Sequence, residues 1–109
     1  MEIALHTLLT PGRELDYDKV HETIPADLAA ALREAGVRDW RIWRDGTHLF
    51  HLIDVEDYQA MRAALREHPA NVAWQEQVGP LHEVKDNYDG RDSGIAHVWS
   101  LSGQVQGPP

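Results

Sequence analysis

Cysteine is absent from this chain of 109 residues. Its absence excludes a disulfide framework, a thiolate nucleophile and the zinc sites that are built on cysteine. Long apolar runs are absent too, since the longest uncharged apolar stretches are far short of the roughly 20 residues needed to cross a bilayer. The opening residues Met-Glu-Ile-Ala have neither the basic nor the apolar region of a secretory signal. We therefore expect a cytoplasmic protein.

Positive charge is scarce. Ten Lys and Arg stand against 18 Asp and Glu, which gives a formal net charge of −8 at pH 7. Phosphate backbones and anionic lipid surfaces repel such a chain, so we expect no nucleic-acid or membrane partner and favour a neutral or cationic ligand. The length and the 42% hydrophobic content are typical of one globular domain, here residues 1–101, with a flexible tail at 102–109.

Strand and helix patterns alternate along the chain. Apolar β-type runs predict strands at residues 3–9, 37–44, 47–55 and 95–101, and Asp45-Gly46 predicts a tight hairpin between the second and third. Three- and four-residue apolar spacing predicts helices from 13 to Gly36, with a kink or break near Pro25, from 58 to 68, and from 72 to 78. The polar stretch 85–94 is expected to be a loop.

This order predicts an α+β fold of the ferredoxin-like βαββαβ type, an antiparallel sheet with helices on one face. In the third strand, His48, Phe50 and Leu52 point to one face, and Leu49 and Ile53 point to the other. Both faces are therefore largely apolar, and the chain is too short for a second helical layer. We expect a homodimer in which the uncovered sheet face packs on a second copy.

Several chemistries find little support. The three serines lie near the C-terminus without a nucleophile elbow, so a serine hydrolase is not expected. His48 and His51 are three apart on a strand, so they project to opposite faces and cannot chelate one metal ion. Asp18 and Glu22 are spaced for paired-carboxylate chemistry, but solvation on an acidic helix explains them better.

Tyr17 and His21 are separated by four residues, which places both side chains on one face of a helix. Histidine transfers protons near neutral pH, and a neighbouring phenol adds a hydrogen bond without adding charge. A packing role is the commoner outcome for such a pair. The chain also has four tryptophans, whose faces can line a ligand pocket or fill the core, namely Trp40, Trp43, Trp74 and Trp99.

Motifs spread over nearly the whole chain carry a resemblance to a known family. They are Thr10-Pro11-Gly12, the Tyr17/His21 pair, Leu28, Gly36, Trp40-Arg41-Ile42, Phe50, Trp74-Gln75 and His97-Val98-Trp99. In this order and spacing they resemble the L-rhamnose mutarotase family of dimeric α/β-barrel aldose 1-epimerases.

The resemblance implies a cofactor-independent isomerase that interconverts the α and β anomers of L-rhamnose without a metal ion. His21 takes the role of general acid, and Tyr17, Trp40, Trp74 and Gln75 take the roles of sugar-binding residues. The acidic neighbours Asp18 and Glu22 are expected to favour the charged form of His21. We expect Trp43 and Trp99 to serve the core or the dimer contact.

Three departures from the family pattern surround the expected pocket. Pro25-Ala26 stands where Trp-Pro is frequent, Trp40 where tyrosine is frequent, and Gln75 where a second tryptophan is frequent. L-Fucose or another neutral sugar is therefore an alternative substrate. Two functions of another class also stay open, a non-catalytic dimer that binds a small metabolite and a dimer whose cleft has lost its role.

Overall fold

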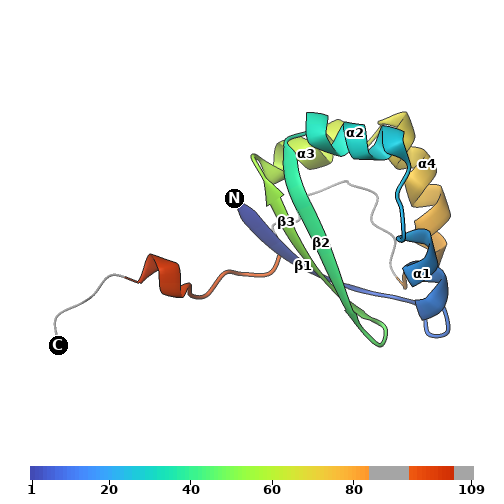
Figure 1. The fold of residues 1–109 in the computed structure, drawn as a ribbon, viewed down its shortest axis with the longest axis horizontal. Coiled ribbons are helices and arrows are strands. Elements are labelled where there is room, and N and C mark those ends of the chain that lie inside the picture. Colours follow the sequence, from blue (N-terminus) through green and yellow to red (C-terminus); the bar gives the residue numbers. More distant parts are fainter. Residues whose placement is uncertain (84–93, 105–109) are drawn as a thin grey trace.

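The computed structural model describes residues 1–83 and 94–104 and shows a small α+β fold. Its elements are β1 (Glu2–Leu8), α1 (Glu14–Val20), α2 (Ala26–Glu34), β2 (Val37–Asp45), β3 (His48–Val55), α3 (Tyr58–Leu65), α4 (Pro69–Val78) and two short 3-10 helices, Gly79–Leu81 and Leu101–Gly103. The three strands form one antiparallel sheet in the order β1-β3-β2, and the four helices lie on one side of it (Figure 1). None of the helices in the described ranges is long and apolar enough to span a membrane.

The break predicted near Pro25 is confirmed. Helix α1 ends at Val20, His21 is its C-cap, and Pro25 is the N-cap of α2. Proline cannot donate a backbone hydrogen bond and its ring crowds the preceding turn, so a continuous helix is interrupted here. The break turns the chain between α1 and α2 and leaves His21 at a helix end.

The hairpin between β2 and β3 is confirmed, with its loop one residue later than predicted. Asp45 still pairs with His48 as the last residue of β2, so the two-residue loop is Gly46-Thr47. Gly46 has a φ of 58°, a conformation that favours glycine. Arg44 fastens the hairpin to α1 through a bidentate ion pair with Asp18, with N–O distances of 2.8 and 2.7 Å.

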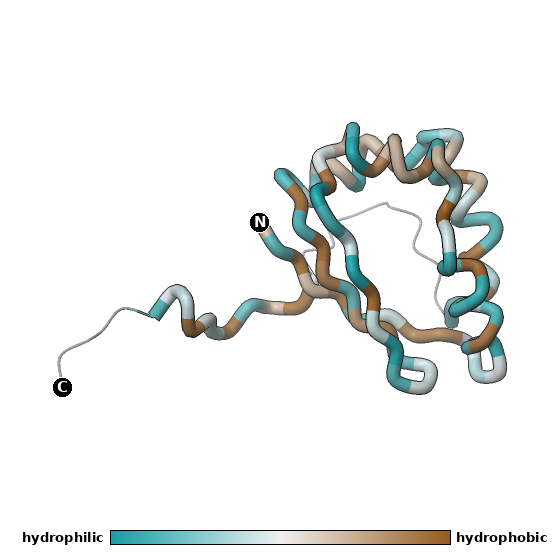
Figure 2. Tube along the Cα trace, in the orientation of Figure 1, coloured by the Kyte–Doolittle hydropathy of each residue, from teal (hydrophilic) through white to brown (hydrophobic). Residues whose placement is uncertain are grey.

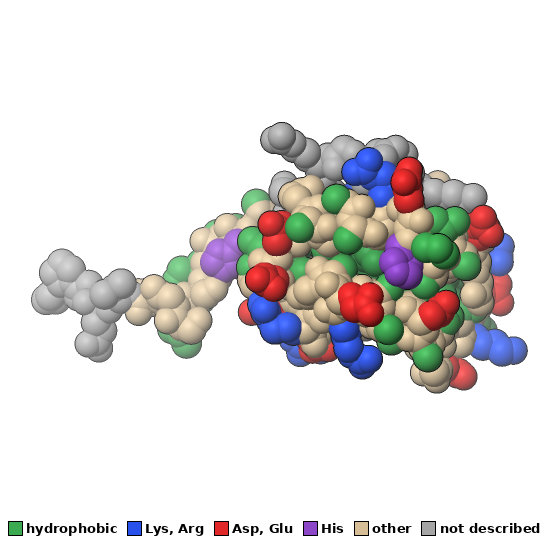
Figure 3. Space-filling model, turned by 90° about the horizontal axis from the view of Figure 1, so that it is seen from above, with side chains coloured by type: hydrophobic (Ala, Val, Ile, Leu, Met, Phe, Trp, Pro, Cys, Tyr) green, Lys and Arg blue, Asp and Glu red, His purple; other side chains and the backbone are tan. Residues whose placement is uncertain are grey.

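The prediction of a fourth strand at 95–101 is wrong. The Ile95 amide donates to the Ala4 carbonyl (2.7 Å), and the chain then leaves the body as an arm without regular strand pairing (Figures 1 and 3). Within the arm, Val98 is 92% and Trp99 is 63% exposed. A β-type sequence forms a strand only where it pairs with a partner edge, and this segment leaves the free edge of β1 after the single contact of Ile95. The ferredoxin-like order is therefore incomplete.

The predictions of a loop at 85–94 and a tail at 102–109 fall mostly outside the described residues, which exclude 84–93 and 105–109. Where the tail begins, Leu101–Gly103 is a short 3-10 helix. Gly94 fits where the arm starts because it has a φ of 76° and because a Cβ there would lie 2.6 Å from the Ala4 carbonyl oxygen.

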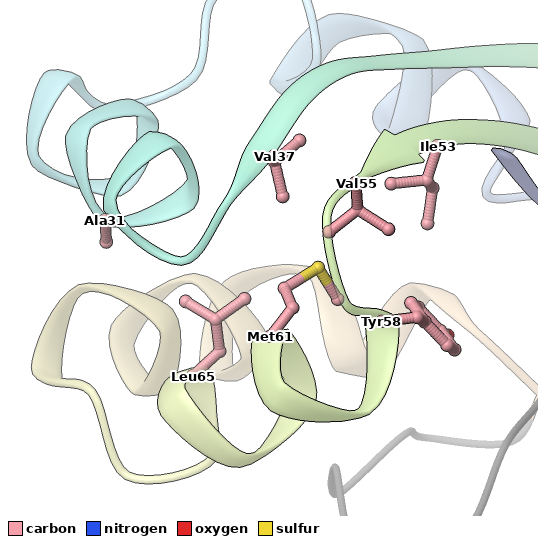
Figure 4. Packing of buried hydrophobic residues seen from close by; sticks show 7 residues of the cluster. All are labelled: Ala31, Val37, Ile53, Val55, Tyr58, Met61 and Leu65. Atoms are coloured by element: carbon pink, nitrogen blue, oxygen red, sulfur yellow. The ribbon is translucent and has the colours of Figure 1, made fainter. Parts of the chain in front are cut away.

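The main core lies between the sheet and helices α2 and α3 (Figure 4). Tyr58, Met61 and Leu65 form one face of α3 at three- and four-residue spacing, and they pack on Ile53 and Val55 of β3. Asp57 caps this helix by accepting a hydrogen bond from the Ala60 amide (3.0 Å). Figure 2 shows apolar and polar residues interspersed along the strands without strict alternation, and β3 contains the adjacent apolar pairs Leu49-Phe50 and Leu52-Ile53.

The two faces of the sheet have different surroundings. The inner face is turned toward the helices and includes Leu5, Thr7, Trp40, Ile42, Leu49 and His51. The outer face is the opposite one and includes His6, Trp43, His48 and Phe50, whose rings contact one another or an adjacent arginine. Trp43 is 51% and Phe50 is 43% exposed, so no described part of the chain covers the centre of this face.

Candidate functional site

A cavity of about 400 Å³ lies between the inner face of the sheet and helices α1, α2 and α4. Its volume is in the range of small-molecule sites. All five residues that the sequence analysis selected line it, namely Tyr17, His21, Trp40, Trp74 and Gln75. The fold thus brings together residues from α1, β2 and α4 that are distant in sequence. Their roles toward a sugar stay predictions.

His21 is held at the end of α1 by its own helix. Its Nδ1 lies 2.9 Å from the Tyr17 carbonyl oxygen. A carbonyl only accepts hydrogen bonds, so Nδ1 carries the proton and donates. In the neutral ring, Nε2 is therefore the atom that can accept a proton. The ring stacks on Tyr17, with centroids 4.0 Å apart, and meets Trp74 edge-on at 5.1 Å.

Asp18 favours the charged form of His21, as expected, but burial of the ring outweighs this effect. Burial of the ring lowers the pKa of His21 below its usual range, and this effect exceeds the opposing influence of the Tyr17 carbonyl and of Asp18. The Asp18 carboxylate is also neutralised by Arg44, which lowers the pKa of Asp18. His21 is therefore mainly neutral at pH 7 and is ready to accept a proton at Nε2.

Tyr17 is 4% exposed and forms the base on which His21 rests. Burial raises the pKa of the Tyr17 phenol well above its usual range, with a smaller contribution from the nearby Asp18 charge. The phenol therefore keeps its proton at any physiological pH. It can act as a hydrogen-bond donor and as an apolar surface, but it does not supply a negative charge.

Helix α4 presents one polar and aromatic face to the cavity. Trp74, Gln75 and Asn71 all line it. The Asn71 side chain is anchored because its Nδ2 donates to the Leu65 carbonyl at 3.0 Å, and Asn71 Oδ1 lies 3.4 Å from Gln75 Nε2. A buried amide that is fixed in this way sets the orientation of the next polar group on the helix.

The inner face of the sheet contributes a chain of three side chains. Trp40 Nε1 donates to His51 Nδ1 at 3.1 Å, so the proton of neutral His51 resides on Nε2, which donates to Thr7 Oγ1 at 3.0 Å. Burial, and next the proximity of His82 and His21, lowers the pKa of His51 to about 4. His51 is thus a neutral hydrogen-bonding residue at pH 7, and the Thr7 hydroxyl hydrogen remains to be donated elsewhere.

Sequence reasoning missed four polar residues of the cavity wall, namely Thr7, His51, Asn71 and His82. Strand alternation was a usable signal for His51, because it shares a face with Leu49 and Ile53. Helical spacing was a usable signal for Asn71, which precedes Trp74 by three and Gln75 by four. No local pattern indicated His82, which follows the short 3-10 helix Gly79–Leu81.

The remaining aromatic candidates lie elsewhere. Trp43 is on the outer face with Arg41, whose guanidinium carbon lies 5.4 Å from the indole centroid. Trp99 is on the arm and its Nε1 donates to Gln104 at 2.8 Å. Neither is buried in the core. His48 and His51 do point to opposite faces, as predicted, and the described residues contain no group of three or more His, Asp or Glu arranged for a metal ion.

A neutral imidazole with one free nitrogen, set among neutral hydrogen-bonding groups and indole walls, can exchange protons with a small uncharged ligand. Fold and site together define a small α+β protein with a cavity lined by neutral hydrogen-bonding and aromatic side chains. Comparison with known proteins gives the family: a family model described as L-rhamnose mutarotase matches residues 2–101. The chain belongs to the L-rhamnose mutarotase family.

Individual relatives agree with this assignment. The chain is 38% identical over 61 residues to the L-rhamnose mutarotase of Paraburkholderia phytofirmans, and this match covers 54% of this chain and 57% of that protein. It is 35% identical over 82 residues to the L-rhamnose mutarotase of Agrobacterium fabrum, and this match covers 73% of this chain and 76% of that protein. The matched segments thus span between about half and three quarters of these relatives.

A solved structure also resembles this fold. The crystal structure of an L-rhamnose mutarotase from Formosa agariphila superimposes with a TM-score of 0.75 at 17% identity, and the match covers 93% of this chain and 98% of that chain. At this identity the likeness concerns the fold alone.

Proposed function

We propose that this protein is a mutarotase that interconverts the α and β anomers of L-rhamnose through the open-chain form. Membership in the family supports the reaction. The observation that carries the proposal is His21, a neutral imidazole in a small-molecule cavity with Nδ1 fixed to the Tyr17 carbonyl and Nε2 available.

The reaction requires little more than a group that exchanges protons near neutral pH, such as the His21 imidazole. To open the ring, the anomeric hydroxyl O1 loses its proton and the ring oxygen O5 gains one. The aldehyde then rotates about the C1–C2 bond and the ring closes on the other face of C1. No bond to a nucleophile forms, so proton transfer and correct positioning supply the rate enhancement.

Each wall of the cavity has a part in this proposal. His21 Nε2 accepts the O1 proton and returns it when the ring closes. Tyr17 stacks on the imidazole and fixes its plane, and its phenol donates a hydrogen bond to the sugar. Trp40 and Trp74 offer indole surface to the C–H faces of the pyranose, and Gln75 binds a hydroxyl. A neutral sugar also suits a chain with net charge −8.

Saturation-transfer NMR tests the proposal. The α and β anomeric resonances of L-rhamnose and of L-fucose are recorded with and without the protein, and the exchange rate between them is measured. We expect the protein to accelerate exchange of L-rhamnose. Faster exchange of L-fucose would assign fucose as the substrate, and acceleration of neither sugar would favour a non-catalytic binding protein.

We further propose a homodimer. The outer face exposes Trp43 and Phe50 at the centre of the sheet, and Val98 and Trp99 extend from the body on the arm. Exposed apolar groups of this kind are typical of an interface, since a monomer rarely leaves them in water. A second copy whose sheet packs against this face covers the rings of both copies at once, which is the arrangement of a two-fold dimer.

A further inference from the structure

His82 repeats the local geometry of His21 in the wall of the same cavity. It follows the 3-10 helix Gly79–Leu81, and its Nδ1 lies 3.0 Å from the Val78 carbonyl, four residues before it. His21 makes the same contact with the Tyr17 carbonyl, also four residues before it. Each carbonyl can only accept, so each neutral imidazole carries its proton on Nδ1 and leaves Nε2 for chemistry.

The backbone holds His82 firmly in place. Its amide donates to the Gly79 carbonyl at 3.1 Å, and His82 forms an isolated antiparallel bridge with Leu9. On either side of it, Thr10 N donates to the Leu81 carbonyl and Glu83 N donates to the Leu8 carbonyl. The segment after α4 is therefore fastened to the end of β1.

Tyr17 connects the two histidines. The His21 ring stacks on the Tyr17 ring with centroids 4.0 Å apart, and the His82 ring meets it edge-on at 5.6 Å. Both imidazoles also line the cavity. One small molecule bound beside Tyr17 can therefore contact both imidazoles. The single-histidine mechanism does not use this pairing of two segments that are distant in sequence.

We propose that His82 is the second proton-transfer residue of this site and that it acts with His21 as a pair on the two oxygens attached to C1. This inference rests on the proposed mutarotase function. His21 has only one nitrogen free, because Nδ1 is held by the Tyr17 carbonyl, so a step that removes a proton from O1 while adding one to O5 needs a second group.

Tyr17 fills that role less well than His82. Burial raises the pKa of the phenol, so Tyr17 holds its proton too tightly to give it to a ring oxygen near neutral pH. An imidazolium is an acid of the strength that neutral-pH proton transfer requires.

The protons and electrons balance over one cycle. Neutral His21 takes the O1 proton at Nε2, and the O–H electron pair becomes the second bond of the C1=O1 carbonyl. The C1–O5 electron pair moves to O5, which receives the Nε2 proton of the His82 imidazolium. After rotation, O5 attacks C1 and returns its proton to His82 while His21 gives its proton back to O1. Both residues end as they began.

The pair works only when it holds a single extra proton. Low pH protonates both rings and removes the base, whereas high pH deprotonates both and removes the acid, so a bell-shaped rate profile follows. The charge of one ring opposes protonation of the other, since proximity to His82 lowers the pKa of His21. The titratable groups with recorded interactions with the pair include Tyr17, which contacts both rings, and His51, whose pKa both rings lower. Asp18 acts on His21 and is itself paired with Arg44.

His82→Gln tests the proposal. The glutamine amide can still donate to the Val78 carbonyl but cannot transfer a proton. We expect kcat for L-rhamnose anomer exchange to fall about 10²-fold with KM changed only a few-fold, and the limb of the pH profile that depends on the acid to disappear. The matched control is His68→Asn, which removes a histidine outside the cavity and keeps an acceptor for the Ala70 amide that His68 caps.

A second measurement keeps the test independent of the variant's folding. In wild-type protein with ¹⁵N-labelled histidine, L-rhamnose should shift the Nε2 resonance of His82 as well as that of His21. An unchanged kcat in folded His82→Gln, or an unmoved His82 resonance, would overturn the proposal. Lack of anomer exchange by the wild type would instead overturn the mutarotase function itself, so the two failures are distinguishable.

Discussion

The two faces of the sheet carry the same kinds of side chain in opposite surroundings. On the inner face, Trp40 and His51 are joined by a 3.1 Å hydrogen bond, and His51 is 8% exposed. On the outer face, His48 stacks on His6 at 5.1 Å and Trp43 is 51% exposed. The inner histidine has its pKa lowered to about 4 by burial. Residue type alone therefore does not assign a role, because burial and hydrogen bonding decide it.

The two faces have the properties of two different kinds of surface. Inner-face groups have a fixed orientation and a fixed protonation state, which a reaction site needs. Outer-face groups present apolar ring surface with little enclosure, which a subunit interface needs. Substitutions on the inner side should change catalysis, and those on the outer side should change the oligomeric state.

The largest effect is expected for substitution of His21. His21→Ala removes the proton acceptor, so anomer exchange of L-rhamnose should slow by ~10²- to 10⁴-fold while the fold persists. His48→Ala on the outer face is the matched control and should leave the rate per protomer unchanged when both proteins are compared at equal concentration. Exchange at the wild-type rate by a folded His21→Ala protein would return His21 to a packing role.

The second prediction concerns pH and stability. Native His51 resists protonation down to about pH 4, whereas an unfolded histidine takes up a proton near pH 6.5. The unfolded state thus binds more protons in this window, so stability falls as pH drops from 6.5 to 4, by about 3 kcal/mol from this residue.

Urea unfolding at pH 7 and at pH 4 measures this loss. His51→Gln keeps a hydrogen-bonding group but cannot titrate, so its stability should fall less over the same interval than that of the wild type. His48→Gln should fall as the wild type does. Equal losses in all three proteins would mean that His51 titrates normally in the folded state.

The third prediction concerns a substitution that should disrupt the proposed dimer interface on the outer face. Phe50→Asp places a carboxylate at the centre of the proposed interface, and the two-fold axis brings in a second one. We expect the dimer dissociation constant to rise at least tens-fold, as for loss of an interface hot spot. Light scattering at micromolar concentration measures it. Leu15→Asp on α1, 78% exposed, is the control and should leave the dimer intact. A wild-type monomer would contradict the dimer proposal.

Local signals in the sequence predicted most of the fold. Pro25 indicated the helix break because proline acts on its own turn, and the Asp45-Gly46 pair indicated the hairpin because turn conformation is set by neighbouring residues. Helix α4 begins at Pro69, three residues before the start at 72 that the sequence predicts. Pro69 occupies the first turn, where proline is tolerated, and His68 caps the helix through the Ala70 amide.

Long-range contacts account for what the sequence did not predict. His82 reaches the cavity only because its segment pairs with the end of β1, which no local pattern encodes. The sequence of the arm is typical of a strand, but whether it pairs depends on how far it follows the edge of β1, which the sequence does not specify. The pKa of His21 followed burial rather than its acidic neighbours, and burial is a property of the assembled cavity.

The fourth prediction separates the tryptophans by face. L-Rhamnose should change the intrinsic fluorescence, because it excludes water from the cavity-lining Trp40 and Trp74. Trp74→Phe should remove most of this response while keeping an aromatic ring in the wall. Trp43→Phe on the outer face should retain it. A full fluorescence response in the Trp74→Phe variant would mean that Trp40, and not Trp74, reports L-rhamnose binding.

The smallest effect is expected for Tyr17→Phe. The ring that supports His21 is kept and one hydrogen bond to the sugar is lost, which costs about 1 kcal/mol, or roughly fivefold in kcat/KM. Tyr58→Phe is the control, because Tyr58 is an equally buried phenol in the main core away from the cavity. Its anomer exchange should match the wild type even if its stability falls. A loss in Tyr17→Phe as large as that of His21→Ala would mean that the phenol itself transfers a proton, and Tyr17 rather than a second histidine would then partner His21.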